Sequence, residues 1–549
     1  MGLIAPKTMP TPYAGIYTDP STNKTFAPRT RPHVLVSAPT GGGKTVLLAS
    51  SSICHPGALI AVSSKYDLMQ KISTRRVGPA YLIDLRQIET PHYGSHIMQC
   101  RIDPTLLIER HDDALNMATW LHRTAGLSMG GRITSHDEPY WAYQIIPALA
   151  ALLWAASPRG NGQGIEWLMH AVENPFKPAP PQPPEPVKIP NPTEQELNYM
   201  IARERVKEIN SDPNAKPSDK KKAERDEYLA KVAYENALAE REAAKRAAEA
   251  AAAMAAAMDM DKSPEERRIE RLSAGEDPAV VYAELPPSWW DARPYFASIP
   301  WSALPTRLER IATLSDRQRD SVALGMSAAL FPWVYESVRR QDLPVFDPMW
   351  LNDPQANLFI LAEPEGGGVG AALPLVQAIV SIWRRKSSMD LLDHNLMLTI
   401  DELTNTLPLP TLDILVSEAR GLGINLLVAL QAAQQIAHRY DPIFMETLLR
   451  IFPAMLVMHG SAEMEMLEQG SLWSGITTRS KESLDQTTGN RLISLEEGPR
   501  FTAQELQPRA QYRGRLLYRG SAGIEVELPS FEQFLHMYDN NTVEGLVRI

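Results

Sequence analysis

The chain has 549 residues, more than one hydrophobic core normally serves, which predicts two or three domains. Hydrophobic residues make up 44% and charged residues 22%, as in a soluble globular protein. The formal net charge of −10 excludes a surface that is basic throughout, so any contacts with nucleic acid must be local. No signal-peptide pattern and no run of about 18 apolar residues is visible, and we expect no transmembrane segment in this chain.

Residues 1–103 alternate apolar runs with turns. The runs at 33–38, 57–64 and 79–85 are typical of buried strands, and 46–53 is typical of a helix. Strands that alternate with helices at this spacing form parallel sheets with crossover connections. We therefore interpret this region as the first part of an α/β domain.

The stretch "SAPTGGGKTVLL" follows the first of these strands and opens the helix. It fits the phosphate-loop pattern G-x-x-x-x-G-K-[ST], except that Ala38 replaces the first glycine. The glycines let successive N–H groups turn toward phosphates, Lys44 reaches the β- and γ-phosphates, and the Thr45 hydroxyl binds Mg²⁺. The loop alone predicts a site for ATP or GTP, and together with the motifs described below the cofactors predicted are ATP and Mg²⁺. The residues expected to contact the nucleotide are Ala38, Thr40, Gly41, Gly42, Gly43, Lys44, Thr45 and Val46.

Residues 104–350 are predicted to form an inserted all-α domain. Apolar residues recur at helical spacing over 112–126, 138–157 and 317–341. Two segments of different composition lie within this domain. They are a Pro-rich linker (175–192) and a charged, Ala-rich helical arm (193–275).

The arm is built from strong helix formers. Thr193 with Glu196, and the start at Ser263, both read as capping boxes. Residues 216–258 would span about 60 Å as one helix, and we expect no sustained heptad seam in them because the second half is mostly alanine. Two interpretations stay open: a solvated helical spacer, or a projecting arm that contacts a partner or a substrate.

The α/β pattern returns in residues 351–549. Apolar runs at 356–364, 395–402, 424–431 and 454–460 predict further strands. Because strands flank the helical block on both sides, we expect one predominantly parallel sheet with a long insertion. After residue 500 the chain is predicted to form strands and a short docking segment.

The run "LMLTIDE" ends a buried strand in two carboxylates. At the carboxyl edge of a parallel sheet these lie beside the phosphate loop. Asp401 would hold Mg²⁺ together with Thr45, and Glu402 would act as general base on the attacking water. The alternative is a strand that ends in two surface carboxylates with no catalytic task.

Two further residues are candidates for catalysis. Gln431 ends the strand "INLLVALQ" and would sense the γ-phosphate. Arg420, in "SEARGLGIN", is either an arginine finger that serves a neighbouring subunit or a surface cation at a helix end.

The order of these motifs resembles that of type IV coupling proteins, the conjugative DNA-transfer ATPases of bacterial type IV secretion. The resemblance covers nearly the whole chain except about 160–285. "AVSSKYDL" keeps Lys65 and Asp67 of a family element but has Ser63 and Ser64 where the family has Asp-Pro.

The longest family signature begins at the acidic pair. It continues through Arg420 and Gly421 to two glutamines, which are Gln431 and Gln435 in this sequence. The resemblance implies a RecA-like P-loop NTPase core, a homo-hexameric ring and a mostly helical second domain. It further implies single-stranded DNA with its relaxase, or secreted proteins, as substrates handed to the type IV secretion channel.

The resemblance places the protein in the cytoplasm, at the cytoplasmic face of the inner membrane. Coupling proteins carry transmembrane helices before the motor, whereas this chain begins just upstream of the motor, so the source of an anchor stays open. Two other functions also stay open: a double-stranded DNA translocase of the chromosome-partitioning type, and a recruiting adaptor switched by nucleotide. The winged-helix DNA reader that ends the chromosome-partitioning group is not evident in the tail.

Overall fold

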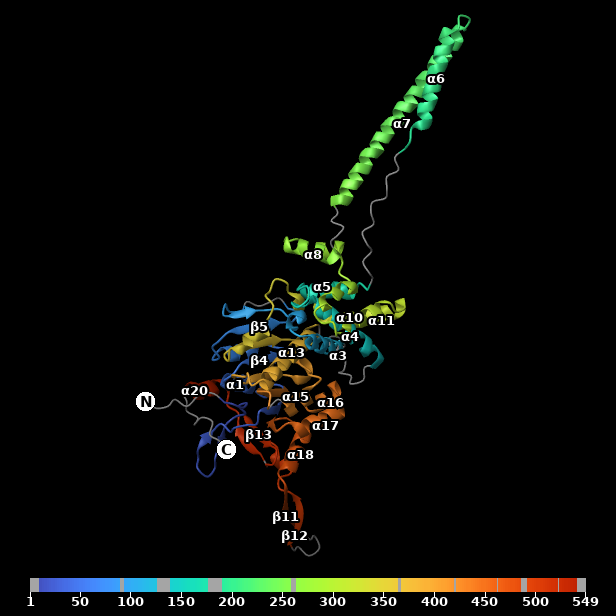
Figure 1. Ribbon diagram of the computed structural model, residues 1–549. Helices are drawn as coiled ribbons and strands as arrows, with labels where there is room; N and C mark the ends of the chain where they lie inside the picture. The colour runs from blue at the N-terminus through green and yellow to red at the C-terminus, as the bar shows by residue number, and fades with distance from the viewer. Residues whose placement is uncertain are drawn as a thin grey trace. The chain divides into compact units, whose positions relative to one another are not determined.

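The protein folds into two compact units, Met1–Phe176 with Ser288–Ile549, and Lys177–Pro287. The computed structural model describes residues 9–88, 93–125, 139–175, 190–257, 263–363, 367–418, 421–461, 463–484, 491–521 and 523–540. The larger unit holds an α/β sheet with helices packed around it, and the smaller unit is helical (Figure 1).

The sheet of the larger unit has ten strands within the described residues, in the order β14-β13-β10-β3-β9-β8-β4-β7-β5-β6. From β10 to β6 every neighbouring pair is parallel. The strands are β3 His33–Ser37, β4 Leu59–Ser63, β5 Ala80–Asp84, β6 Ile97–Gln99, β7 Asn357–Leu361, β8 Leu396–Ile400, β9 Ile424–Leu430, β10 Ala454–Met458, β13 Arg513–Tyr518 and β14 Ile524–Glu527. The predicted single sheet, assembled from both ends of the chain, is confirmed.

The central strands are mostly apolar because helices cover both faces of the sheet. Every residue of β3, β4, β7, β8, β9 and β10 is buried. Strand β9 lies between β3, which leads into the phosphate loop, and β8, which ends at the acidic pair. An extra strand at this place is typical of RecA-like cores, and the predicted α/β fold class is confirmed.

Helices α1 (Lys44–Cys54), α2 (Tyr66–Ser73) and α20 (Phe531–Asn540) pack on one apolar cluster of the sheet. That cluster includes side chains of β3, β4, β9 and β10. The other helices that follow strands are α13 Gly368–Ser388, α14 Leu403–Thr406, α15 Leu412–Glu418, α16 Gln434–Arg439, α17 Pro442–Ile451, α18 Met464–Trp473 and α19 Ala503–Leu506.

The C-terminal part of the chain completes one edge of the sheet. Strand β13 pairs antiparallel with β10, β14 pairs antiparallel with β13, and α20 packs on α1. A separate antiparallel ribbon, β11 (Ile476–Leu484) with β12 (Arg491–Pro499), precedes them. The predicted tail of strands and a docking segment is confirmed.

Helical segments of the region 104–352 also belong to the larger unit. They are η1 Pro104–Leu107, α3 His111–Thr124, α4 Pro139–Ala156, α5 Gly164–Val172, η3 Trp289–Phe296, α10 Leu304–Ala312, α11 Asp316–Leu330, η4 Phe331–Val334, α12 Glu336–Arg339 and η5 Pro348–Asn352. The prediction of one helix over 317–341 is wrong. The α-helix ends at Leu330 because Pro332, which has no N–H to donate, follows at once.

The smaller unit contains α6 Thr193–Ser211, α7 Pro217–Ala257, α8 Pro264–Ser273 and α9 Pro278–Glu284. Helix α7 has 41 residues, about 60 Å at 1.5 Å per residue, as expected. The capping box at Ser263 and Glu266 is confirmed. The one at Thr193 is wrong, because the N-cap is Pro192 and the Thr193 hydroxyl donates instead to Asn191.

Helices α6 and α7 pack into a hairpin, whose rings Tyr199 and Tyr234 stack with centroids 5.9 Å apart (Figure 1). The less exposed residues recur at steps of three and four on both helices. They include Gln195, Tyr199, Ala202, Val206 and Ile209 on α6, and Ala223, Glu227, Ala230, Tyr234 and Ala237 on α7, where Val232 is also half-buried. A short seam of about two heptads, formed largely by small alanines, is therefore present over 223–237, and the absence of a sustained heptad seam over 216–258 stays a prediction.

The proposed division of the chain into 1–103, 104–350 and 351–549 differs from the two compact units and stays a proposal. Within the described part of the chain, none of the helices combines the length and the hydropathy that a membrane crossing requires.

Candidate functional site

The phosphate loop joins the end of β3 to the start of α1. Gly41 has φ 76° and Gly43 has φ 87°, left-handed conformations that glycine adopts without strain. Helix α1 begins at Lys44 directly after Gly43, and no side chain caps its N-terminus. The first N–H groups of the helix have no acceptor inside it, so they are available to an anion held by the loop.

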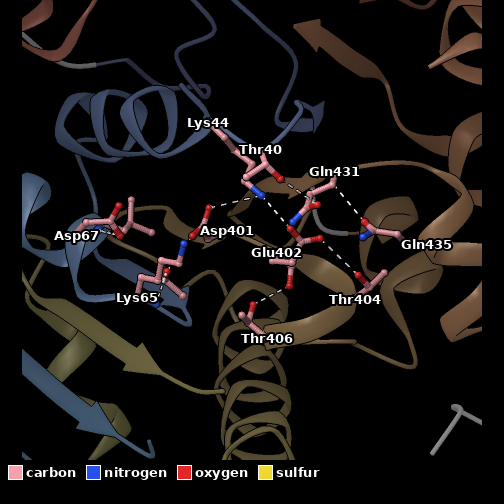
Figure 2. A network of polar contacts seen from close by, with 12 residues as sticks. Thr40, Lys44, Lys65, Asp67, Asp401, Glu402, Thr404, Thr406, Gln431 and Gln435 are labelled. Atoms are coloured by element: carbon pink, nitrogen blue, oxygen red, sulfur yellow. Dashed lines mark hydrogen bonds and ion pairs between the residues drawn. The ribbon is translucent and has the colours of Figure 1, made fainter. Parts of the chain in front are cut away.

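Asp401 and Glu402 follow β8 and lie opposite this loop. Both are buried, with 7% of each residue exposed. Lys44 Nζ lies 2.9 Å from Glu402 Oε2 and 4.0 Å from Asp401 Oδ1. Figure 2 shows the ammonium group directed at both carboxylates. The structure thus brings together the lysine and the acidic pair that were singled out from the sequence.

Asp401 is held by one hydroxyl and keeps one oxygen free. Ser63 Oγ donates to Oδ2 at 2.9 Å, whereas Oδ1 is buried and has no hydrogen-bond partner among the described residues. Burial raises the pKa of Asp401, and the charge of Lys44 and the Ser63 hydrogen bond partly oppose that rise. A buried carboxylate oxygen without a donor is suited to a cation or to the water that a cation holds.

Glu402 is positioned by the turn that follows the strand. Its backbone carbonyl accepts from Thr406 Oγ1 at 2.7 Å, and Thr404 Oγ1 donates to Oε1 at 3.5 Å. These contacts aim the carboxylate across the carboxyl edge of the sheet toward the loop (Figure 2). Neither threonine was singled out from the sequence, because hydroxyl residues after a strand are common.

Gln431 follows β9, the strand next to β3. Thr40 Oγ1 lies 3.4 Å from Gln431 Oε1, so the glutamine side chain contacts the phosphate loop. The Gln431 N–H donates to Gln435 Oε1 at 3.3 Å, which orients the peptide that carries it. The two glutamines are thus coupled to each other and to the loop (Figure 2).

Glu463 is a buried carboxylate at the same edge of the sheet that the sequence reasoning missed. It accepts the Ala433 N–H on both oxygens, at 2.9 and 3.1 Å, and burial raises its pKa. Beside it, Ser461 Oγ lies 2.7 Å from Ser37 Oγ at the end of β3. The sequence could have pointed to Glu463 because this carboxylate follows shortly after a buried strand, which is also how Asp401 was identified.

Arg420 lies outside the described residues, so its role as an arginine finger stays a prediction. Lys65 is the N-cap of α2, and its N–H donates to Ser63 Oγ at 3.1 Å. Ser63, which stands where the family has aspartate, therefore links the start of α2 to Asp401.

Residues 395–510 match the family model described as the TraM recognition site of TraD and TraG. Over these residues the chain is similar to the TraD and TraG family. The match includes the acidic pair, Gln431 and the β11–β12 ribbon, and it confirms the resemblance to type IV coupling proteins.

Solved structures of the bacterial conjugative coupling protein TrwB resemble the chain at low identity. The unbound monoclinic form of TrwBdeltaN70 has 15% identity and a TM-score of 0.43, covering 91% of this chain and 85% of that one. TrwB with the GTP analogue GDPNP has 15% identity and a TM-score of 0.44, covering 91% and 86%. TrwB with ADP and Mg²⁺ has 16% identity and a TM-score of 0.42, covering 91% and 85%. No curated protein matches the sequence significantly.

Proposed function

We propose that the protein is an ATP-hydrolysing coupling protein that recruits DNA with its attached relaxase, or secreted proteins, and drives them into a type IV secretion channel. The observation that carries the proposal is the contact of Lys44 with Glu402 and Asp401 inside a chain whose residues 395–510 match the TraD and TraG family. A lysine at the start of the helix after β3 and two carboxylates at the end of β8, two strands away in the sheet, are the groups that phosphoryl transfer to water requires.

The residues present fit ATP with Mg²⁺. Gly41 and Gly43 leave room and backbone freedom at the loop, where a Cβ at position 41 would meet nothing within 4 Å. Asp401 Oδ1 is buried and has no hydrogen-bond partner among the described residues, and the Thr45 hydroxyl at the start of α1 would complete the set that holds the ion. When bound, Mg²⁺ would neutralise charge on the phosphates.

Each protein group has a separate role in the proposal. Lys44 binds the phosphates, Glu402 accepts a proton from the attacking water, and Gln431 senses the γ-phosphate through its contact with Thr40. Arg420 would act on the nucleotide of the next subunit, so the proposal includes a homo-hexameric ring in the active state. The ring would work at the cytoplasmic face of the inner membrane.

An ATPase assay on the full chain with Mg²⁺, with and without single-stranded DNA, tests this function. We expect hydrolysis that single-stranded DNA stimulates. Binding of ATP without turnover under both conditions would support a recruiting adaptor switched by nucleotide. Stimulation by double-stranded DNA alone would support a translocase of the chromosome-partitioning type, although the described tail joins the main sheet through β13 and β14.

A further inference from the structure

Helices α4 and α10 of the larger unit form a surface hollow of about 360 Å³. The residues that line it are Tyr143, Gln144, Ala303, Thr306, Arg307, Arg310 and Ile311. Two arginines and one tyrosine line the hollow, and none of its described lining residues is a carboxylate. In a chain with a formal net charge of −10, a hollow of this composition is a local basic site.

The two arginines are exposed and one helical turn apart, so they lie on the same face of α10. Among the described residues, neither Arg307 nor Arg310 forms a salt bridge or a side-chain hydrogen bond. The carboxylate between them, Glu309, is already paired with Arg293 at 3.1 Å. Both guanidinium groups are therefore free to bind an anion.

Two tyrosines repeat this spacing on α4. Tyr140 is 52% and Tyr143 is 70% exposed, and they also lie one turn apart. Exposed rings of this size at consecutive turns add nothing to the core of the protein. The ring of Tyr143 lines the hollow together with the two arginines, and Tyr140 lies one turn before it on the same helix.

We propose that Tyr140, Tyr143, Arg307 and Arg310, the α4–α10 surface, bind single-stranded nucleic acid. Arginines that contact phosphates and aromatic rings that stack on bases are the two elements of single-strand recognition without sequence preference. An acidic protein segment would use the arginines but would leave the tyrosines without a task. The inference rests on the proposed function and names a place on the motor chain where its DNA substrate is held.

The sequence alone did not show this site. No basic run with interleaved aromatic residues occurs in the chain, because the tyrosines and the arginines are separated by more than 160 residues. The packing of α10 on α4 brings them to one surface (Figure 1).

The test measures binding of fluorescein-labelled oligo(dT) of about 20 nucleotides to the full chain without ATP, by fluorescence anisotropy. In Arg307→Ala/Arg310→Ala we expect affinity roughly tenfold lower at 0.1 M salt, and a salt slope smaller by about 1.4, since two phosphate contacts are lost. In Tyr143→Ala we expect affinity lower by about fivefold or more, with an unchanged salt slope.

Two variants serve as matched controls. Arg450→Ala removes an exposed arginine that is already paired with Glu446, and Tyr228→Ala removes a tyrosine that is 67% exposed on α7. Both should bind oligo(dT) as the wild type does. Thermal melting of all variants shows that the fold is retained, which matters because Arg310 also lies in the last turn of α10.

Unchanged affinity in either the arginine or the tyrosine variant overturns the proposal. Equal displacement of oligo(dT) by polyglutamate also overturns it, in favour of an acidic protein segment, and so does tighter binding of blunt duplex DNA. If single-stranded DNA stimulates ATP hydrolysis while the variants bind normally, only this inference fails. If the variants lose binding but DNA never stimulates the wild type, the site stands and the proposed motor fails.

Discussion

The ammonium group of Lys44 lies 2.9 Å from the carboxylate of Glu402, so the two residues with the most different proposed tasks neutralise each other in this structure. The pair is largely shielded from water, with 15% and 9% of the side chains exposed. A phosphate that enters the loop must compete with Glu402 for the lysine. In the proposed function, this competition would couple nucleotide binding to release of the Glu402 carboxylate from Lys44.

Glu402→Gln should bind ATP more tightly than the wild type and lose hydrolysis. The amide keeps the shape of the side chain but removes the negative charge that competes for Lys44, and it cannot accept the proton of water. We expect affinity higher by about threefold to tenfold, since a charged hydrogen bond contributes about 1.5–3 kcal/mol and only part of it is regained. Equilibrium binding of a fluorescent ATP analogue and a phosphate-release assay measure the two effects. Hydrolysis at the wild-type rate would show that Glu402 is not the base.

Lys44→Met should destabilise the protein even without nucleotide, in addition to abolishing ATP binding. The substitution leaves Asp401 and Glu402 buried side by side without their cation, which costs on the order of 3 kcal/mol. Urea unfolding in the absence of Mg²⁺ measures the loss. In the double variant Lys44→Met/Glu402→Gln we expect about half of it to be recovered. Strict additivity of the two single changes would contradict the coupling inferred from the geometry.

Ser63→Ala should lower the affinity of the ATP site for Mg²⁺, so that ATP binding requires a higher Mg²⁺ concentration. The Ser63 hydroxyl donates to Asp401 Oδ2 at 2.9 Å and leaves Oδ1 for the ion, so its loss frees the carboxylate to rotate. Loss of such a supporting hydrogen bond lowers metal affinity by about tenfold or more. A Mg²⁺ titration of ATP binding measures the change. Ser64→Ala, at the neighbouring position, is the control and should titrate as the wild type does.

The sequence predicted the central sheet and the main site because their signals are local and strong. Strands β8 and β9 are apolar except for one polar residue each, which favours burial on both faces, and Lys44 and Glu402 stand at fixed offsets from such runs. The predicted strands were each between one and four residues too long. Their terminal residues, Asp401 and Gln431 among them, leave the ladder to form the site.

The features that sequence reasoning missed depend on packing between distant segments. The Ala223–Ala237 seam has almost no hydrophobic contrast, and only the partner helix reveals it. Glu463 resembles any surface glutamate until the Ala433 N–H is found within hydrogen-bond distance. Tyr143 and Arg310 likewise have no shared pattern in the sequence and meet only through the packing of α4 and α10.

His33 should make the larger unit less stable at acidic pH. The ring is buried at the start of β3, neither ring nitrogen has a hydrogen-bond partner among the described residues, and burial lowers the pKa of His33 to about 4. Between the ordinary pKa of about 6.5 and this value, the unfolded chain binds a proton that the folded chain does not. Stability is therefore lost as the pH falls from about 6.5 to 4.

His33→Leu removes this group and tests its contribution. From pH 7 to pH 4 the free energy of unfolding should fall by roughly 3 kcal/mol less in His33→Leu than in the wild type, measured by urea titration at each pH. The exposed His536, changed to Ala, serves as the control and should keep the wild-type pH dependence. Parallel pH profiles of wild type and His33→Leu would contradict the assignment.

Removal of residues 177–287 should leave the larger unit folded. The residues just before and just after this segment are held together by hydrogen bonds. The Trp289 N–H donates to the Asn174 carbonyl at 3.1 Å, and the Trp289 indole donates to the Val172 carbonyl at 3.1 Å. A Gly/Ser linker of about four residues can therefore close the chain without strain.

The shortened chain should melt as cooperatively as the full chain and hydrolyse ATP at the same basal rate, because the phosphate loop and the acidic pair lie entirely within the larger unit. Differential scanning calorimetry and an ATPase assay measure the two properties. If coupling to a partner or substrate is then lost while basal hydrolysis persists, the α6–α7 hairpin is a binding arm. If melting, basal hydrolysis and coupling are all unchanged, the α6–α7 hairpin is a spacer. A shortened chain that aggregates would contradict the independence of the larger unit, and Trp289→Ala in the full chain would then show how far stability depends on this junction.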